Sequence, residues 1–216
     1  MLTLFCLVRM SRNNFNEFDG KAREWDNNPV HIERSEAIAR SLLSVVPLNK
    51  EMHALEFGAG TGLLSFLLKH HFATITLMDS SGEMINVVRA KIAHQQITHM
   101  IPVQTDLETE DFPGLFDIIY TQMVFHHVAN LDTVLKKFFR LLRPGGYMAI
   151  ADLYPEDGSF HGEGFTGHPG FDVNWLSDKL HTLGFTGVSH RQCYSIKKPG
   201  PDGISEFPVF LMTART

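Results

Sequence analysis

Residues 52–68, MHALEFGAGTGLLSFLL, combine one carboxylate with three closely spaced glycines. An apolar run ends at Glu56, and Gly58, Gly60 and Gly62 follow before a second apolar run. Glycine allows a positive φ and a close approach of a ligand to the backbone, and a helix start offers unpaired N–H groups. Glu56 would repel a pyrophosphate but attract a cationic or hydroxyl-bearing group. The stretch predicts a ligand-binding turn between a strand and a helix, although a purely structural turn would also use glycine.

A second acid follows the next apolar run. Residues 75–78 are apolar and end at Asp79, and Ser80, Ser81 and Glu83 then have the pattern of a helix start. An acid at the end of a second strand can accept hydrogen bonds from ribose hydroxyls, and dehydrogenases use one in this way. Asp79 therefore indicates a nucleoside ligand without deciding between cofactors.

The order acid-x-Gly-x-Gly-x-Gly resembles the first motif of the class I S-adenosylmethionine-dependent methyltransferases. It departs from the Gly-x-Gly-x-x-Gly fingerprint of dinucleotide-binding proteins. The resemblance implies S-adenosylmethionine as cofactor and S-adenosylhomocysteine as product. It also implies that the cofactor is held near the first two strands by Glu56, Gly58, Ala59, Gly60, Thr61, Gly62, Asp79, Ser80 and Met84.

Two later motifs resemble the same family. Asp106 and Leu107 follow a short strand at residues 100–103, where the family binds adenine through a carboxylate and the next backbone N–H. An Asp at this place also caps turns routinely. Further on, residues 143–146, RPGG, end a predicted helix before a strand at 147–153, an order that strongly resembles the family.

The strand predicted at residues 116–120 leads into TQMVFHHV. In a doubly wound sheet, ligands bind at the carboxyl ends of the strands where the strand order reverses. The resemblance places Thr121, Gln122 and Met123 beside the methionine moiety, and Phe125, His126 and His127 on the substrate side. An alternative is that one of the two adjacent rings packs under the following helix and the other caps it.

Residues 152–171 form a long segment rich in glycine, proline, aromatics and acids. Such loops in compact domains are functional or disordered, and the aromatics favour an ordered lid. Candidate substrate contacts are Asp152, Tyr154, His161 and Phe165, and the alternative is that they pack the loop onto the body. If the acceptor needs a general base, His126 is the first candidate and His161 the second.

No metal site is predicted. None of the twelve histidines has the spacing of a signature such as H-E-x-x-H. A cluster of Asp152, Glu156, Asp157 and His161 could hold a divalent ion, but nothing in the sequence defines its geometry.

Residues 1–30 are predicted to form an N-terminal arm, with residues 31–216 as a single methyltransferase domain. Aromatic anchors lie at Phe15, Phe18 and Trp25 in a polar background. Related methyltransferases carry a comparable segment that folds over the cofactor, so Trp25 is expected to contact the substrate side and exclude water. The polar run after Met10 suggests that residue as the true start.

The predicted elements that position these residues alternate between strand and helix, including an amphipathic helix at residues 33–46 and another through 85–94. Strands at 187–195 and 207–213 are joined by the turn KKPGPDG, which is too short for a crossover, so they are antiparallel neighbours. The predicted fold is α/β: a Rossmann-like, doubly wound, seven-stranded, mostly parallel sheet with an antiparallel last strand and helices on both faces. A Rossmann dehydrogenase would not normally end this way.

The composition of the chain limits the kinds of partner that it is expected to bind. The chain has 216 residues, 44% of them hydrophobic, and a net charge of −5, which indicates a globular protein and argues against a nonspecific nucleic-acid binder. The apolar start at residues 1–8 is too short to span a membrane. Cys6 and Cys193 form no metal or redox motif, so a reducing, cytoplasmic location is expected.

The sequence therefore predicts a methyltransferase that acts on a small-molecule acceptor. Two alternatives remain open: a noncatalytic adenosyl-ligand-binding or regulatory protein on the same fold, and an NAD-dependent oxidoreductase. Glu56, the glycine spacing and the antiparallel ending argue against the oxidoreductase. The acceptor and the oligomeric state are not encoded in any motif.

Overall fold

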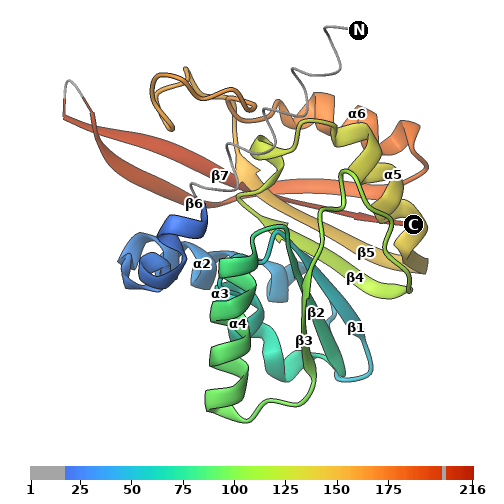
Figure 1. The fold of residues 1–216 in the computed structure, drawn as a ribbon. Coiled ribbons are helices and arrows are strands. Elements are labelled where there is room, and N and C mark those ends of the chain that lie inside the picture. The colour runs from blue at the N-terminus through green and yellow to red at the C-terminus, as the bar shows by residue number, and fades with distance from the viewer. Residues whose placement is uncertain (1–17, 201–202) are drawn as a thin grey trace, which may run out of the picture.

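The computed structural model describes residues 18–200 and 203–216. The first part of the predicted arm, with Cys6, Met10 and Phe15, lies outside the described residues. The described chain folds as one seven-stranded sheet flanked by helices (Figure 1).

The strands lie side by side in the order β3-β2-β1-β4-β5-β7-β6. Their bounds are β1 His53–Phe57, β2 Thr74–Asp79, β3 Met100–Gln104, β4 Phe116–Gln122, β5 Leu142–Leu153, β6 Thr186–Gly200 and β7 Gly203–Arg215. β1 pairs in parallel with β2 on one side and with β4 on the other, so the strand order reverses between β1 and β4. Such a reversal is the place where doubly wound sheets bind ligands.

The helices connect the strands and cover both faces of the sheet (Figure 1). The α-helices are α2 Pro29–Val45, α3 Leu63–Leu68, α4 Gly82–Gln95, α5 Leu131–Leu141 and α6 Val173–Thr182. The short 3₁₀ helices are η1 Ala22–Asn27, η2 Lys69–His71 and η3 Phe125–His127. α2, α3 and α4 share one hydrophobic core with the sheet, and α5 and α6 share a second core on the opposite face.

The last two strands form a long hairpin. β7 is antiparallel to both β5 and β6, which confirms the predicted antiparallel ending. Both strands are longer than predicted, because pairing continues from Lys197 opposite Glu206 to Gly200 opposite Gly203. The tip of the hairpin projects beyond the rest of the sheet (Figure 1).

Two local boundaries differ from the prediction. α2 begins at Pro29, four residues before the predicted start, because Asn28 caps it by accepting a hydrogen bond from the N–H of Val30. α5 ends at Leu141, before the RPGG turn. The turn instead forms an irregular start of β5, where Gly145 has a φ of 77°. Among the described residues, no helix is long and apolar enough to cross a membrane.

Candidate active site

The glycine turn connects β1 to α3 as the sequence predicts. Gly58, Gly60 and Gly62 all have positive φ, from 54° to 80°. At Gly58 a side chain is excluded by space as well, because a Cβ would lie 2.4 Å from Cγ2 of Val124. Val124 belongs to the loop after β4, so the missing side chain at Gly58 lets the two loops at the crevice meet.

Asp79 at the end of β2 lies against this turn. Its Oδ2 accepts a hydrogen bond from the N–H of Gly60 at 2.7 Å, and its Oδ1 accepts one from the N–H of Ser81 at 2.8 Å. Burial raises the pKa of Asp79, and these backbone N–H groups oppose the rise. Each oxygen keeps a lone pair, so the carboxylate can still accept from a ribose hydroxyl.

Glu56, at the end of β1, bonds to the helix that follows the turn. Its side chain is fully buried, and its Oε2 accepts hydrogen bonds from the backbone N–H and the hydroxyl of Ser65 in α3. The hydroxyl of Ser65 also lies 2.7 Å from that of Tyr120. Burial raises the pKa of Glu56 to about 8, so the carboxyl is largely protonated at neutral pH. Glu56 therefore ties β1 to α3 beneath the turn. Its Oε1 is buried without a hydrogen-bond partner among the described residues, and its contact with the cofactor stays a prediction.

The described part of the N-terminal arm closes over the turn. Asp26 accepts hydrogen bonds from the hydroxyl of Thr61 and from Nζ of Lys91, which lies 2.8 Å from its Oδ2. Asp19 accepts a hydrogen bond from the hydroxyl of Ser81. Trp25 packs on His31 of α2, with 4.2 Å between ring centroids. The arm thus contacts residues of both predicted cofactor loops, as a lid would.

The remaining predicted cofactor residues lie along the same edge of the sheet. Asp106 bonds to its own turn, with Oδ1 accepting from the N–H of Glu108 and Oδ2 from the hydroxyl of Thr109. It therefore caps that turn, and its contact with the cofactor stays a prediction. Gln122 accepts a hydrogen bond from Ser35 of α2. Ala59, Met84, Leu107 and Thr121 are buried, Ser80 is half-buried, and Met123 has a positive φ of 54°.

The loops after β4 and β5 bring His126 and Asp152 together. Nδ1 of His126 lies 2.6 Å from Oδ1 of Asp152, and the backbone N–H of His126 donates to Oδ2 at 3.3 Å. Both residues are almost completely buried. Burial alone would raise the pKa of Asp152, but attraction to His126 and its hydrogen bonds outweigh burial and lower it. The side chain of Asp152 is thus held by His126 and by the backbone N–H of Leu153.

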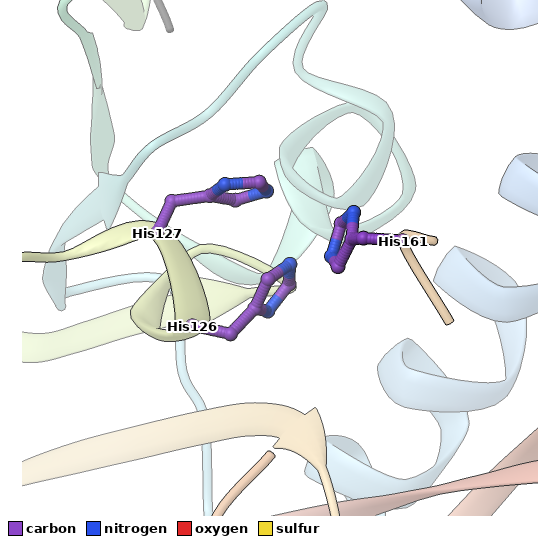
Figure 2. A group of neighbouring side chains, drawn as sticks. All are labelled: His126, His127 and His161. Carbon is purple, nitrogen blue, oxygen red and sulfur yellow. The ribbon is translucent and has the colours of Figure 1, made fainter. Parts of the chain in front are cut away.

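His127 and His161 complete a group of three imidazoles around His126 (Figure 2). Burial, with His126 and His161 nearby, lowers the pKa of His127 to about 3, so its ring is neutral. Phe165 stacks on His161 with 3.9 Å between ring centroids. The predicted lid therefore places His161 and Phe165 over His126. Its backbone is tied to the same place, because the N–H of His168 donates to the carbonyl oxygen of His126.

Two predicted substrate contacts lie elsewhere. Phe125 is fully buried in the core beneath α5, where it packs on Phe57 and Phe138. It was assigned to the substrate side from its place after β4, but η3 turns its side chain into the core. Tyr154 packs on Phe210 of β7 with 5.4 Å between ring centroids and does not join the histidines.

Arg34 is a site residue that the sequence analysis missed. It lies on the buried face of α2 with 7% of its surface exposed, and its Nε has no hydrogen-bond partner among the described residues. Burial lowers the pKa of Arg34 to about 10, while the charge of Asp152 opposes the decrease. A cation at this position in an amphipathic pattern resembles an ordinary surface residue, so only the tertiary structure identifies it.

The fold and site together define a doubly wound domain that presents a glycine turn, an acid at the end of β2 and a buried histidine–carboxylate pair at one crevice. Comparison with known proteins shows what this domain is similar to. Residues 55–150 match the model of the methyltransferase domain. The structure of the N-methyltransferase NodS from Bradyrhizobium japonicum, bound to S-adenosylhomocysteine, superposes with a TM-score of 0.70 at 20% identity. The superposition covers 94% of this chain and 98% of NodS. Residues 55–150 thus match a methyltransferase domain, and the chain has the fold of the class I S-adenosylmethionine-dependent methyltransferases.

Two curated relatives are similar in sequence. A polyketide synthase-nonribosomal peptide synthetase from Pyricularia grisea is 35% identical over 133 residues, which are 58% of this chain and 3% of that protein. The malonyl-[acyl-carrier protein] O-methyltransferase from Priestia megaterium is 28% identical over 139 residues, which are 62% of this chain and 48% of that enzyme. The matched region thus spans less than half the length of either relative.

Proposed function

We propose that this protein transfers the methyl group of S-adenosylmethionine to a small acyl acceptor, at an atom that must first lose a proton. The observation that carries the proposal is the buried pair of His126 and Asp152, whose ring nitrogen and carboxylate oxygen are 2.6 Å apart. The sulfonium already activates the methyl group, so a positioned base has a role only when the acceptor atom is protonated. A noncatalytic binding protein would gain nothing from this pair.

The roles of the two residues follow from hydrogen-bond geometry. If Asp152 accepts from Nδ1–H of His126, then Nε2 carries the lone pair and can take a proton from the acceptor. Attack on the methyl carbon then forms a new bond as the C–S bond breaks, and neutral S-adenosylhomocysteine leaves. The imidazolium that forms is stabilised by the adjacent carboxylate. The aromatic lid and the arm exclude water, and holding the two reactants in line supplies much of the rate.

The buried cation of Arg34 favours an acceptor that carries a carbonyl or carboxylate oxygen. Its buried guanidinium lacks a partner at Nε and interacts electrostatically with Asp152 beside His126. A carbon flanked by two carbonyls loses a proton to form an enolate, and a fixed cation stabilises the charge that develops on oxygen. The names of the two relatives concern malonyl and polyketide groups, both of which are acyl groups of this kind. We therefore favour a 3-oxoacyl thioester as the acceptor.

The test uses S-adenosylmethionine labelled in the methyl group. N-acetylcysteamine thioesters carrying acetoacetyl, malonyl and 3-hydroxybutyryl groups are offered in parallel, and the products are separated by mass. The proposal predicts transfer to the α-carbon of the acetoacetyl thioester. Transfer to the malonyl carboxylate alone would contradict the need for a base. Thermal unfolding with S-adenosylhomocysteine and with NAD accompanies the assay, and stabilisation by NAD alone would contradict the cofactor as well.

A further inference from the structure

The cluster formed by His126, His127 and His161 has a geometry that proton transfer by His126 alone does not require. One ring nitrogen from each residue lies within 4.8 Å of the other two. Figure 2 shows a nitrogen of each ring facing the space between the three rings. We propose that this three-histidine cluster binds one divalent transition-metal ion of the zinc class.

The spacing of the rings fits such an ion. A tetrahedral ion about 2.0–2.1 Å from three imidazole nitrogens places the ring centres about 5 Å apart. The centroids of His126 and His161 are 5.0 Å apart, those of His127 and His161 are 5.1 Å apart, and those of His126 and His127 are 4.2 Å apart. The ligand nitrogens of such a site are about 3.3 Å apart, so small side-chain rotations complete the coordination.

Asp152 supplies the support that a ligating histidine normally has. Metal-bound imidazoles donate their other ring N–H to a carboxylate or carbonyl, which orients the ring and strengthens the ligand. Oδ1 of Asp152 lies 2.6 Å from Nδ1 of His126, so the other ring nitrogen, Nε2, is the one that faces the cluster. The pair therefore prepares His126 as a ligand as well as a base.

Hydrogen bonds do not explain why the three histidine rings lie together. Nδ1 of His127 is buried without a hydrogen-bond partner among the described residues. The rings of Phe18 and Phe165 pack on His127 at centroid distances of 5.1 and 5.4 Å, so its surroundings are largely apolar. His161 is exposed, which gives an ion a path from solvent.

The donor set selects the class of metal. Three neutral imidazoles suit Zn²⁺, Co²⁺, Ni²⁺ or Cu²⁺, whereas Mg²⁺ and Ca²⁺ require oxygen ligands. The sequence analysis predicted no metal because the third ligand comes from a distant loop and no spacing motif links it to the first two. A metal on Nε2 of His126 takes the lone pair that would accept a proton. The metal-bound form and the proton-accepting form are therefore mutually exclusive, and the ion would inhibit the proposed reaction.

The experiment titrates the full chain, purified without a histidine tag and stripped with a chelator, with Co²⁺. Nitrogen ligands around tetrahedral Co²⁺ give visible absorption bands, which Zn²⁺ then abolishes by displacing it. The variants are His127→Ala and His161→Ala, and the control is His181→Ala, which removes an exposed histidine from α6. Circular dichroism checks that each variant is folded. Mg²⁺ serves as the negative control for displacement of Co²⁺.

The proposal predicts one Co²⁺ per chain, displacement by Zn²⁺ but not Mg²⁺, and at least tenfold weaker binding in both variants with no change in His181→Ala. Weak binding by the wild type, or wild-type affinity in either His127→Ala or His161→Ala, would overturn it. Neither S-adenosylmethionine nor an acceptor is present in this experiment. Its failure would therefore leave the proposed methyl transfer standing, since proton removal by His126 and Asp152 needs no metal.

Discussion

His126 and Asp152 are 26 positions apart in the chain, yet a ring nitrogen of one lies 2.6 Å from a carboxylate oxygen of the other. The sheet explains this contact. β4 and β5 are parallel neighbours, and Gln122 at the end of β4 pairs with Ala151 near the end of β5. Because both strands end at the same edge, the next residues of each must meet there. A polar pair so deeply buried is costly unless each partner satisfies the other, and here the two side chains bond to each other.

Arg34→Gln is expected to raise the KM for the acceptor about tenfold or more while leaving the affinity for S-adenosylhomocysteine unchanged. The guanidinium is placed to bind an oxygen of the acceptor, and a lost charge-assisted hydrogen bond is worth about 1.5–3 kcal/mol. Arg40→Gln, on the exposed face of the same helix, is the matched control. Loss of S-adenosylhomocysteine affinity with an unchanged KM would assign Arg34 to the cofactor instead.

Asp79→Ala is expected to weaken S-adenosylhomocysteine binding about 5- to 150-fold, as measured by calorimetry. This range corresponds to about 1–3 kcal/mol for the lost hydrogen bonds to ribose hydroxyls. Asp178→Ala changes an exposed acid of α6 and should bind as the wild type does. Wild-type affinity in Asp79→Ala would show that the ribose does not bind to the carboxylate at the end of β2.

Gly58→Ala and Gly162→Ala separate backbone strain from lack of space. Both positions have positive φ, 65° and 82°, but a Cβ at Gly58 would meet Val124 at 2.4 Å and one at Gly162 meets nothing within 4 Å. Urea unfolding should show a loss of about 1 kcal/mol at Gly162, and a further 1–3 kcal/mol at Gly58 from overpacking. Adding Val124→Ala should recover part of the loss at Gly58 only. Equal losses at the two glycines would mean that the loops do not meet as described.

Glu56 predicts a pH dependence of stability in the ligand-free protein. Burial raises its pKa from 4.5 to about 8, so between these values the folded state holds a proton that the unfolded state has released. The stability that the protonated Glu56 carboxyl contributes is therefore fully present below about pH 4.5. This contribution falls as pH rises toward 8, by on the order of 1 kcal/mol of unfolding free energy per pH unit.

Glu56→Gln cannot titrate, so its free energy of unfolding should lose this slope between pH 5.5 and 7.5, whatever its absolute stability. Urea unfolding at both pH values measures the slope. Glu51→Gln, at an exposed position, should keep the wild-type slope. An identical slope in Glu56→Gln and the wild type would show that the carboxyl titrates normally.

Local patterns predict much of this architecture. An apolar run ending in an acid and a glycine turn predicts β1, its turn and α3, because positive φ and strand endings are local properties. The same reasoning correctly places the end of a strand at Asp79 and the antiparallel hairpin.

Side-chain direction could not be predicted, because it depends on contacts between distant segments. The sequence gives no sign that Ser65 of α3 would bond to one carboxyl oxygen of Glu56. Phe125 and His126 are adjacent, and η3 sends one into the core and the other to Asp152. Arg34 became a candidate only when α2 was seen to bury it.

The most direct test of the account is the turnover of Asp152→Asn with the acetoacetyl thioester, measured beside the wild type and the lid control Asp157→Asn. The account predicts that kcat falls about 10²- to 10⁴-fold in Asp152→Asn, because His126 loses the partner that sets its tautomer. The KM for S-adenosylmethionine and the Tm should change little, and Asp157→Asn should resemble the wild type. Wild-type turnover in a folded Asp152→Asn variant would contradict proton removal by this pair.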